Sequence, residues 1–124
     1  MLLVCRFSVV GSVDEFTGRA RRALELLTAQ PGCRRGQLSR STDDHEHFVL
    51  TVEFDSVVAY RRAMSPFDVR EHVIPLLSRA LPEPSAFEPL LLGEAGVVTR
   101  EESLVAADAF TVRLGEAGGP ATAR

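Results

Sequence analysis

Residues 47–54, with the sequence HFVLTVEF, decide the fold, because they form the clearest β-strand pattern in the chain. Large apolar side chains occupy every second position: Phe48, Leu50, Val52 and Phe54. A period of two is typical of a strand that turns one face to the core. The positions between them also include the apolar Val49, so we expect this strand to lie in the middle of a sheet.

The residues at the start of the chain predict a strand followed by a helix. Residues 2–10 alternate between apolar and polar side chains, which indicates a half-buried strand. Ser12 and Glu15 have the spacing of a capping box, which marks the beginning of a helix. Apolar residues then recur at steps of three and four as far as Leu27, so the helix has one apolar stripe.

A second strand and a turn are expected between this helix and the central strand. Residues 33–40 predict a polar strand, and residues 41–46 predict the turn of a hairpin. The acidic and histidine residues from Asp43 to His47 have the composition of a metal cluster. They lack the helical histidine pair of known zinc motifs, and aspartate is a common turn residue. We therefore expect a turn and no metal site.

Two helices and a last strand are expected after the central strand. A short helix is predicted over residues 56–64, and a second helix begins at Pro66. Pro75 lies inside this second helix and should kink or divide it. Residues 86–92 predict the last strand, and Pro89 within it indicates the edge of the sheet.

The resulting order is strand, helix, strand, strand, helix, strand over residues 1–92. This order predicts an α+β domain of the ferredoxin-like type, with a four-stranded antiparallel sheet. Helices would cover one face of the sheet, and the other face would present apolar residues such as Val49 and Leu91. A second copy of the chain is the simplest cover for that face, so we expect a homodimer.

Residues 93–124 have a different character and form a C-terminal extension. A short helix from Thr99 through Ala107 and a strand over Ala109–Leu114 are predicted in it. The extension is either partly ordered or wrapped around the partner subunit.

The length, charge and cysteine content restrict the classes of function. The chain has 124 residues, which suits one domain, and its net charge of −3 argues against nucleic acid as the main partner. No apolar run is long enough to span a membrane, and no signal peptide is apparent. Cys5 and Cys33 match no zinc or redox spacing. We therefore expect a cytoplasmic protein with free thiols.

The stretch from Leu27 to Pro75 resembles the antibiotic biosynthesis monooxygenase family. The matching features are a QPG turn at 30–32, an acidic STDD hairpin at 41–44, a strand that ends in glutamate plus an aromatic residue, and a helix with a histidine. The resemblance implies a dimeric α+β barrel with a pocket between sheet and helices. Some members of the family oxidise phenols or anthrones with dioxygen and no cofactor, and others bind or degrade haem.

The sequence departs from both kinds of member. Phe54 stands where the family usually has tryptophan, and the chain has no Lys, Asn or Trp at all. The asparagine and tryptophan of the haem-degrading members are therefore missing. Of the Asn, Trp and Tyr set of the quinone-forming members, only Tyr60 remains.

His72 and Tyr60 are the catalytic candidates. His72 matches the helical histidine of the family, and in a pocket it would act as a base or bind haem iron. Its alternative position is on the surface, beside Glu71. Tyr60 would hydrogen-bond a substrate oxygen, or its ring would pack in the core.

Five further residues are candidates for substrate binding: Phe7, Phe54, Arg61, Phe67 and Glu53. The three phenylalanines would give an apolar lining or fill the core. Arg61 would hold an anionic group or face solvent. Glu53 would enter the pocket, or it would face the partner subunit, where an ion pair between subunits with Arg6 or Arg35 is possible. Cys5 alternates with Phe7 and would also line the pocket.

The function expected from these features is cofactor-independent monooxygenation of a flat, polyketide-like aromatic. The first alternative is a ligand-binding or accessory dimer without activity. The second is a haem-binding or haem-degrading protein that uses His72.

Overall fold

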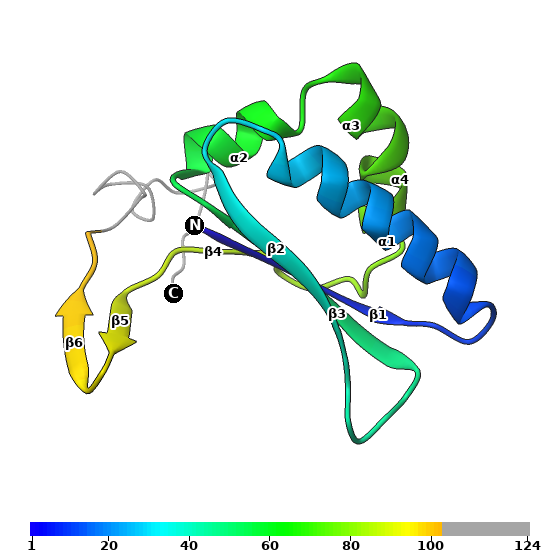
Figure 1. Ribbon diagram of the computed structural model, residues 1–124, viewed down its shortest axis with the longest axis horizontal. Coiled ribbons are helices and arrows are strands. Elements are labelled where there is room, and N and C mark those ends of the chain that lie inside the picture. Colours follow the sequence, from blue (N-terminus) through cyan, green and yellow to red (C-terminus); the bar gives the residue numbers. More distant parts are fainter. Residues whose placement is uncertain (103–124) are drawn as a thin grey trace, which may run out of the picture. The chain divides into compact units, whose positions relative to one another are not determined.

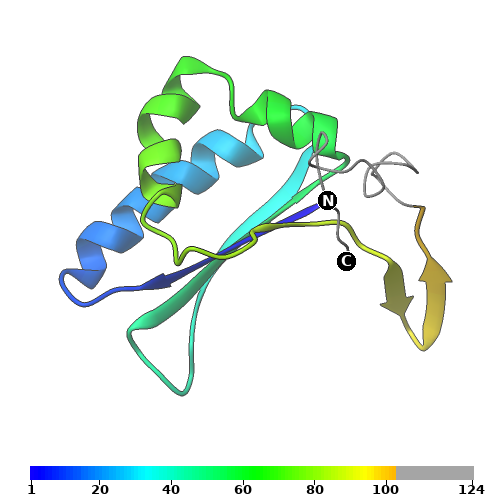
Figure 2. The same cartoon turned by 180° about the vertical axis from the view of Figure 1, so that it is seen from behind.

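The computed structural model describes residues 1–102, which divide into two units, Met1–Phe87 and the residues from Glu88 onward. The first unit contains an antiparallel sheet with the strand order β2-β3-β1-β4. Its strands are β1 (Leu2–Ser8), β2 (Cys33–Arg40), β3 (His47–Phe54) and β4 (Ala86–Phe87). Its helices are α1 (Val13–Thr28), α2 (Val57–Ala63), α3 (Phe67–His72) and α4 (Ile74–Leu77). All four helices lie on one side of the sheet (Figure 1, Figure 2).

This architecture confirms the predicted ferredoxin-like α+β fold. β3 is central and pairs with both β2 and β1, as its two-faced apolar pattern predicted. The alternate side chains of β3 are buried under the helices: Phe48, Leu50, Val52 and Phe54. Phe16 of α1 completes an aromatic cluster, with its ring centroid 5.0 Å from that of Phe7 and 5.2 Å from that of Phe48.

The helix boundaries follow from local capping chemistry. The Ser12 hydroxyl accepts a hydrogen bond from the Glu15 N–H, and the Ser56 hydroxyl accepts one from the Ala59 N–H, each at 3.0 Å. The expected division near Pro75 is present, since α3 ends at His72 and α4 begins at Ile74. None of the helices within residues 1–102 has the length and apolar character needed to cross a bilayer.

Helix α2 lies unusually close to the start of β2. Gly32 has a φ of +83°, and a Cβ atom placed on it would be 2.6 Å from the Cβ of Ala59. A side chain at position 32 would therefore collide with α2 and would also be strained by the backbone conformation. The small residues at these two positions set the distance between α2 and the sheet.

The face of the sheet opposite the helices, here called the open face, carries apolar and charged side chains. Its apolar residues are Leu2, Val4, Val49 and Phe87, and Phe87 is exposed. An ion pair between Arg35 and Glu53, with Nε and Oε2 3.0 Å apart, lies on the same face. No helix of the first unit covers this face (Figure 2).

The predicted last strand is only partly correct. β4 ends at Phe87, and Pro89, which has no N–H to donate to a strand, follows it. Leu91 therefore does not belong to the open face. It begins strand β5 (Leu91–Glu94), which pairs with β6 (Val97–Arg100) in a separate hairpin.

The prediction that Thr99 opens a helix is wrong, because Thr99 lies in β6. The turn at Ala95 and Gly96, both with positive φ, has the geometry of a tight hairpin. Arg100, also part of that predicted helix, lies in β6 as well. The part of the helix from residue 103 onward and the strand predicted over Ala109–Leu114 lie outside the described residues.

Candidate functional site

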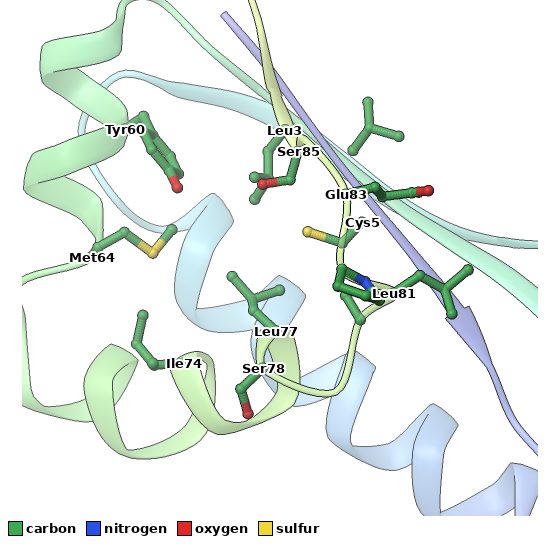
Figure 3. Close-up of a pocket in the computed structure, with 13 residues that line it drawn as sticks. Leu3, Cys5, Tyr60, Met64, Ile74, Leu77, Ser78, Leu81, Glu83 and Ser85 are labelled. Atoms are coloured by element: carbon green, nitrogen blue, oxygen red, sulfur yellow. The ribbon is translucent and has the colours of Figure 1, made fainter. Parts of the chain in front are cut away.

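A cavity of about 450 Å³ lies between the sheet and the helices of the first unit. β1, α2, α4 and the loop over residues 78–85 form its wall (Figure 3). Most of the wall is apolar and includes Leu3, Met64, Ile74, Leu77 and Leu81. The volume lies within the range of roughly 300–1,000 Å³ that is usual for small-molecule sites. This cavity is therefore the candidate functional site.

Tyr60 supplies a hydrogen-bonding group to the cavity. Tyr60 and Met64 are one helical turn apart and both line the wall. The Tyr60 ring meets the edge of the buried Phe54 ring at 5.5 Å between centroids, which positions its phenol. The hydroxyl points into the cavity (Figure 3), and it has no hydrogen-bond partner within residues 1–102.

Burial makes the Tyr60 phenol harder to ionise than an exposed tyrosine. Desolvation raises the pKa of Tyr60 above its ordinary value, and the neighbouring Cys5 adds to the rise, while Arg61 opposes it. At neutral pH the side chain is therefore a hydrogen-bond donor to a ligand oxygen rather than a base.

Cys5 is a second polar group of the wall. Its sulfur points into the cavity (Figure 3), although the side chain is almost fully buried. Burial raises the pKa of the Cys5 thiol to about 11. Since the thiolate is the reactive form of cysteine, Cys5 is an inert part of the wall at neutral pH.

The carboxylate in the wall, Glu83, is held by an arginine. Arg6 donates from Nε and Nη2 to the two oxygens of Glu83, at 2.7 and 2.8 Å. These hydrogen bonds lower the pKa of Glu83. Its carboxylate points away from Tyr60 (Figure 3), so it is not placed to take a proton from a ligand there.

The loop that carries Glu83 is fastened to β1 along its length. The Leu81 N–H donates to the Arg6 carbonyl at 2.8 Å, and the Val4 N–H donates to the Ser85 carbonyl at 2.7 Å. The loop is thus held against β1, and the hydroxyl of Ser85, which also lines the cavity, points to the side on which Tyr60 lies (Figure 3).

Seven site residues were predicted, and within the described residues Tyr60 is the one of them that lines the cavity. His72 lies on α3, and its Nε2 is 3.8 Å from the Glu71 carboxylate on a side chain that is 46% exposed. The buried side of α3 is formed by Val69, and Val73 just after the helix is also buried. His72 lies on the exposed side of this segment and is not part of the described wall. Its catalytic role stays a prediction.

The other predicted binding residues do not line the cavity either. Phe7 and Phe54 fill the core, and Phe54 acts on the site only through its contact with Tyr60. Arg61 is exposed on α2, and Phe67 is 66% exposed at the start of α3. Glu53 lies on the open face and forms an ion pair with Arg35 of the same chain, whereas the expected ion pair was one between subunits.

Several wall residues were missed by the sequence analysis. Met64 was detectable, because it lies four residues after Tyr60 and so shares its helical face. Leu3 shares the buried face of β1 with Cys5, and this alternation was also detectable. Glu83 and Ser85 come from a loop, and loops have no periodicity that would reveal which way a side chain points.

A family model described as antibiotic biosynthesis monooxygenase matches residues 9–71. No curated protein matches the sequence significantly.

Solved structures share the fold. SnoaB, a cofactor-independent oxygenase from Streptomyces nogalater, is 27% identical with a TM-score of 0.59, over 72% of this chain and 94% of SnoaB. Rv0793 from Mycobacterium tuberculosis is 20% identical with a TM-score of 0.59, over 76% of this chain and 96% of its own. A conserved protein from Methanosarcina mazei Go1 is 17% identical with a TM-score of 0.59, over 82% of this chain and 91% of its own.

Proposed function

The chain belongs to the antibiotic biosynthesis monooxygenase family, and on that premise we propose that it is a cofactor-independent monooxygenase of a flat, electron-rich aromatic compound. The observation that carries the proposal is the apolar cavity into which Tyr60 points a protonated phenol that has no hydrogen-bond partner within residues 1–102. A polyketide-like phenol or enol would fill such a cavity and accept a hydrogen bond from Tyr60. The similarity to SnoaB supports the absence of a cofactor.

The protein would contribute orientation and charge stabilisation to this reaction. The Tyr60 O–H would donate to the substrate oxygen, where negative charge develops as the phenol or enol ionises. The electron-rich carbon would then form a bond to dioxygen and give a peroxide anion, which takes up a proton from solvent. The resulting hydroperoxide would lose water. One oxygen atom would enter the product as a carbonyl and the other would leave as water.

The described wall supplies no free base for the ionisation. Tyr60 and Cys5 are protonated, and Glu83 is bound to Arg6. We propose that an acidic substrate ionises by itself, with its anion favoured by Tyr60. If His72 were the base, the substrate proton would have to leave the cavity to reach it, because His72 lies outside the described wall.

The test is oxygen consumption with a hydroxylated anthrone as the probe. We expect Tyr60→Phe to lower kcat/KM by about tenfold or more, since one hydrogen bond to a developing charge is lost. Met64→Leu keeps the wall apolar and should stay near the wild-type value. Equal rates for Tyr60→Phe and the wild type would reject the role of Tyr60, and a loss of turnover in His72→Ala would restore His72 as the base.

The second candidate function is ligand binding without turnover, and it is favoured by the lack of a free base in the described wall. Saturable binding of the same aromatic probe with no oxygen uptake would identify it. The haem alternative receives no support, because the histidine proposed to bind iron lies outside the described wall.

We further propose that the functional form is a homodimer that packs through the open face. The support is the apolar surface that the helices leave uncovered, which includes Leu2, Val4, Val49 and Phe87. Contiguous apolar patches of this kind mark interaction sites, and a symmetric dimer covers the same patch on both subunits.

A further inference from the structure

The loop over residues 78–85 brings a second hydroxyl group, that of Ser85, to the cavity wall. The backbone of Ser85 is held in place, because its carbonyl accepts a hydrogen bond from the Val4 N–H at 2.7 Å. The next residue, Ala86, begins β4 and pairs with Leu3 of β1. The Ser85 side chain is partly buried, and its hydroxyl points to the side on which Tyr60 lies (Figure 3). Ser85 is therefore constrained almost as a strand residue is.

Ser85 and Tyr60 supply the two wall hydroxyls that have no hydrogen-bond partner within residues 1–102. The third hydroxyl of the wall, that of Ser78, donates to the Pro75 carbonyl at 2.7 Å. The carboxylate of Glu83 is bound in its ion pair on the other side of the loop. The thiol in the wall is only a weak hydrogen-bond donor. A polar ligand atom in the cavity thus has two strong partners available.

The two hydroxyls differ in what they require of a ligand. Tyr60 is a donor at neutral pH, since its pKa is raised, so it needs an acceptor such as a carbonyl or a phenolate oxygen. The Ser85 hydroxyl both donates and accepts, so it binds a carbonyl or a hydroxyl group equally well. The matching ligand offers one acceptor oxygen to Tyr60 and a second oxygen of either kind to Ser85.

The rest of the cavity favours hydrocarbon. Ile74 and Leu77 of α4 lie across the cavity from Ser85 (Figure 3). Met64 of α2 adds further apolar wall. A polar group of the ligand against these side chains would lose its contact with water and gain no hydrogen bond. The wall thus suits a ring system with oxygen atoms on one edge and only hydrogen atoms on the other.

We propose that Ser85 determines the specificity of the cavity, by binding a second oxygen atom on the same edge of the aromatic ligand as the oxygen that Tyr60 binds. One hydrogen bond leaves a flat ring free to turn in its plane, whereas two determine which ring carbon faces the apolar side. A ligand without the second oxygen would leave the Ser85 hydroxyl unpaired, which lowers its affinity. This role deepens the proposed function and rests on it, because the ligand is the flat aromatic compound proposed there.

The test measures the affinity of the full-length chain for three naphthols by calorimetry, without dioxygen so that none of them is consumed. 1,8-Dihydroxynaphthalene has two oxygen atoms on one edge, 1-naphthol has one, and 1,5-dihydroxynaphthalene has two on opposite edges. We expect the wild type to bind the 1,8-isomer about three- to tenfold more tightly than the other two, as one added hydrogen bond allows. Ser85→Ala should lose this preference and keep its affinity for 1-naphthol within about twofold.

The matched control is Ser78→Ala, which removes a wall hydroxyl that is already bonded to the Pro75 carbonyl. This variant should keep the wild-type preference for the 1,8-isomer. A wild type without the preference, or a preference that survives in Ser85→Ala, would overturn the role of Ser85. A wild type that binds none of the naphthols would overturn it as well. Oxygen uptake with the hydroxylated anthrone reports separately on the monooxygenase, so the two proposals fail in different measurements.

Discussion

Three side chains in this protein lose a proton between about pH 8 and 12, because the sequence contains two cysteines, one tyrosine and no lysine. Two of the three, Cys5 and Tyr60, line the cavity. In most proteins the titration of lysines obscures this range of pH. In this protein, side-chain titration at alkaline pH therefore comes mainly from residues of the cavity wall.

We expect the free energy of unfolding to fall as the pH rises from 9 to 11. The Cys5 thiol ionises near its ordinary value of 9.0 when unfolded and near about 11 when folded. Between these values the unfolded chain binds fewer protons, so rising pH favours unfolding. The loss should reach about 2–3 kcal/mol, and Tyr60, whose pKa is also raised, adds to it above pH 10.0.

Urea denaturation at a series of pH values measures this loss. The control is Cys5→Ala, which should be less stable at neutral pH by about 1 kcal/mol because a small buried side chain is removed. Its stability should nevertheless fall much less than that of the wild type between pH 9 and 11. Parallel curves for the two proteins would show that the buried thiol is not the cause.

At the scale of elements, the contact between Gly32 and Ala59 sets the position of α2 and therefore of Tyr60. Gly32→Ala should destabilise the protein by about 1–3 kcal/mol, because the new methyl group overlaps Ala59 and strains a backbone with positive φ. Gly18→Ala, in the middle of α1 with no atom within 4 Å of the new Cβ, should stabilise it by about 0.5–1 kcal/mol. Thermal unfolding compares the two, and changes of the same sign would contradict the explanation.

How far the elements could be predicted depended on whether a local signal marked their ends. The strands at 33–40 and 47–54 matched the structure residue for residue, because a turn and an alternating pattern define them. The strand predicted at 86–92 was too long, since β-forming leucines continue past Pro89 into the separate hairpin. The cavity was harder to predict, because part of its wall is a loop whose side-chain directions depend on tertiary contacts such as that of Arg6 with Glu83.

At the scale of the whole molecule, the open face predicts how assembly responds to a new charge. We expect Val49→Asp to weaken the dimer on the order of 100-fold, because twofold symmetry buries the unpaired charge on both subunits. Val10→Asp, at an exposed loop position, should leave the dissociation constant unchanged. Sedimentation equilibrium measures both, and equal constants would argue that the dimer uses another face.

The contact between Arg6 and Glu83 connects the two sides of the sheet. Arg6 projects from the open face, whereas Glu83 belongs to the cavity wall. A second subunit on that face would exclude water from the ion pair, which increases the Coulomb attraction between the two charges and makes their separation more costly. The loop over 78–85 would then be held more firmly, so a bound molecule that must displace this loop to leave would dissociate more slowly from the dimer than from the monomer. Residence time at the cavity would in this way depend on the concentration of the protein itself.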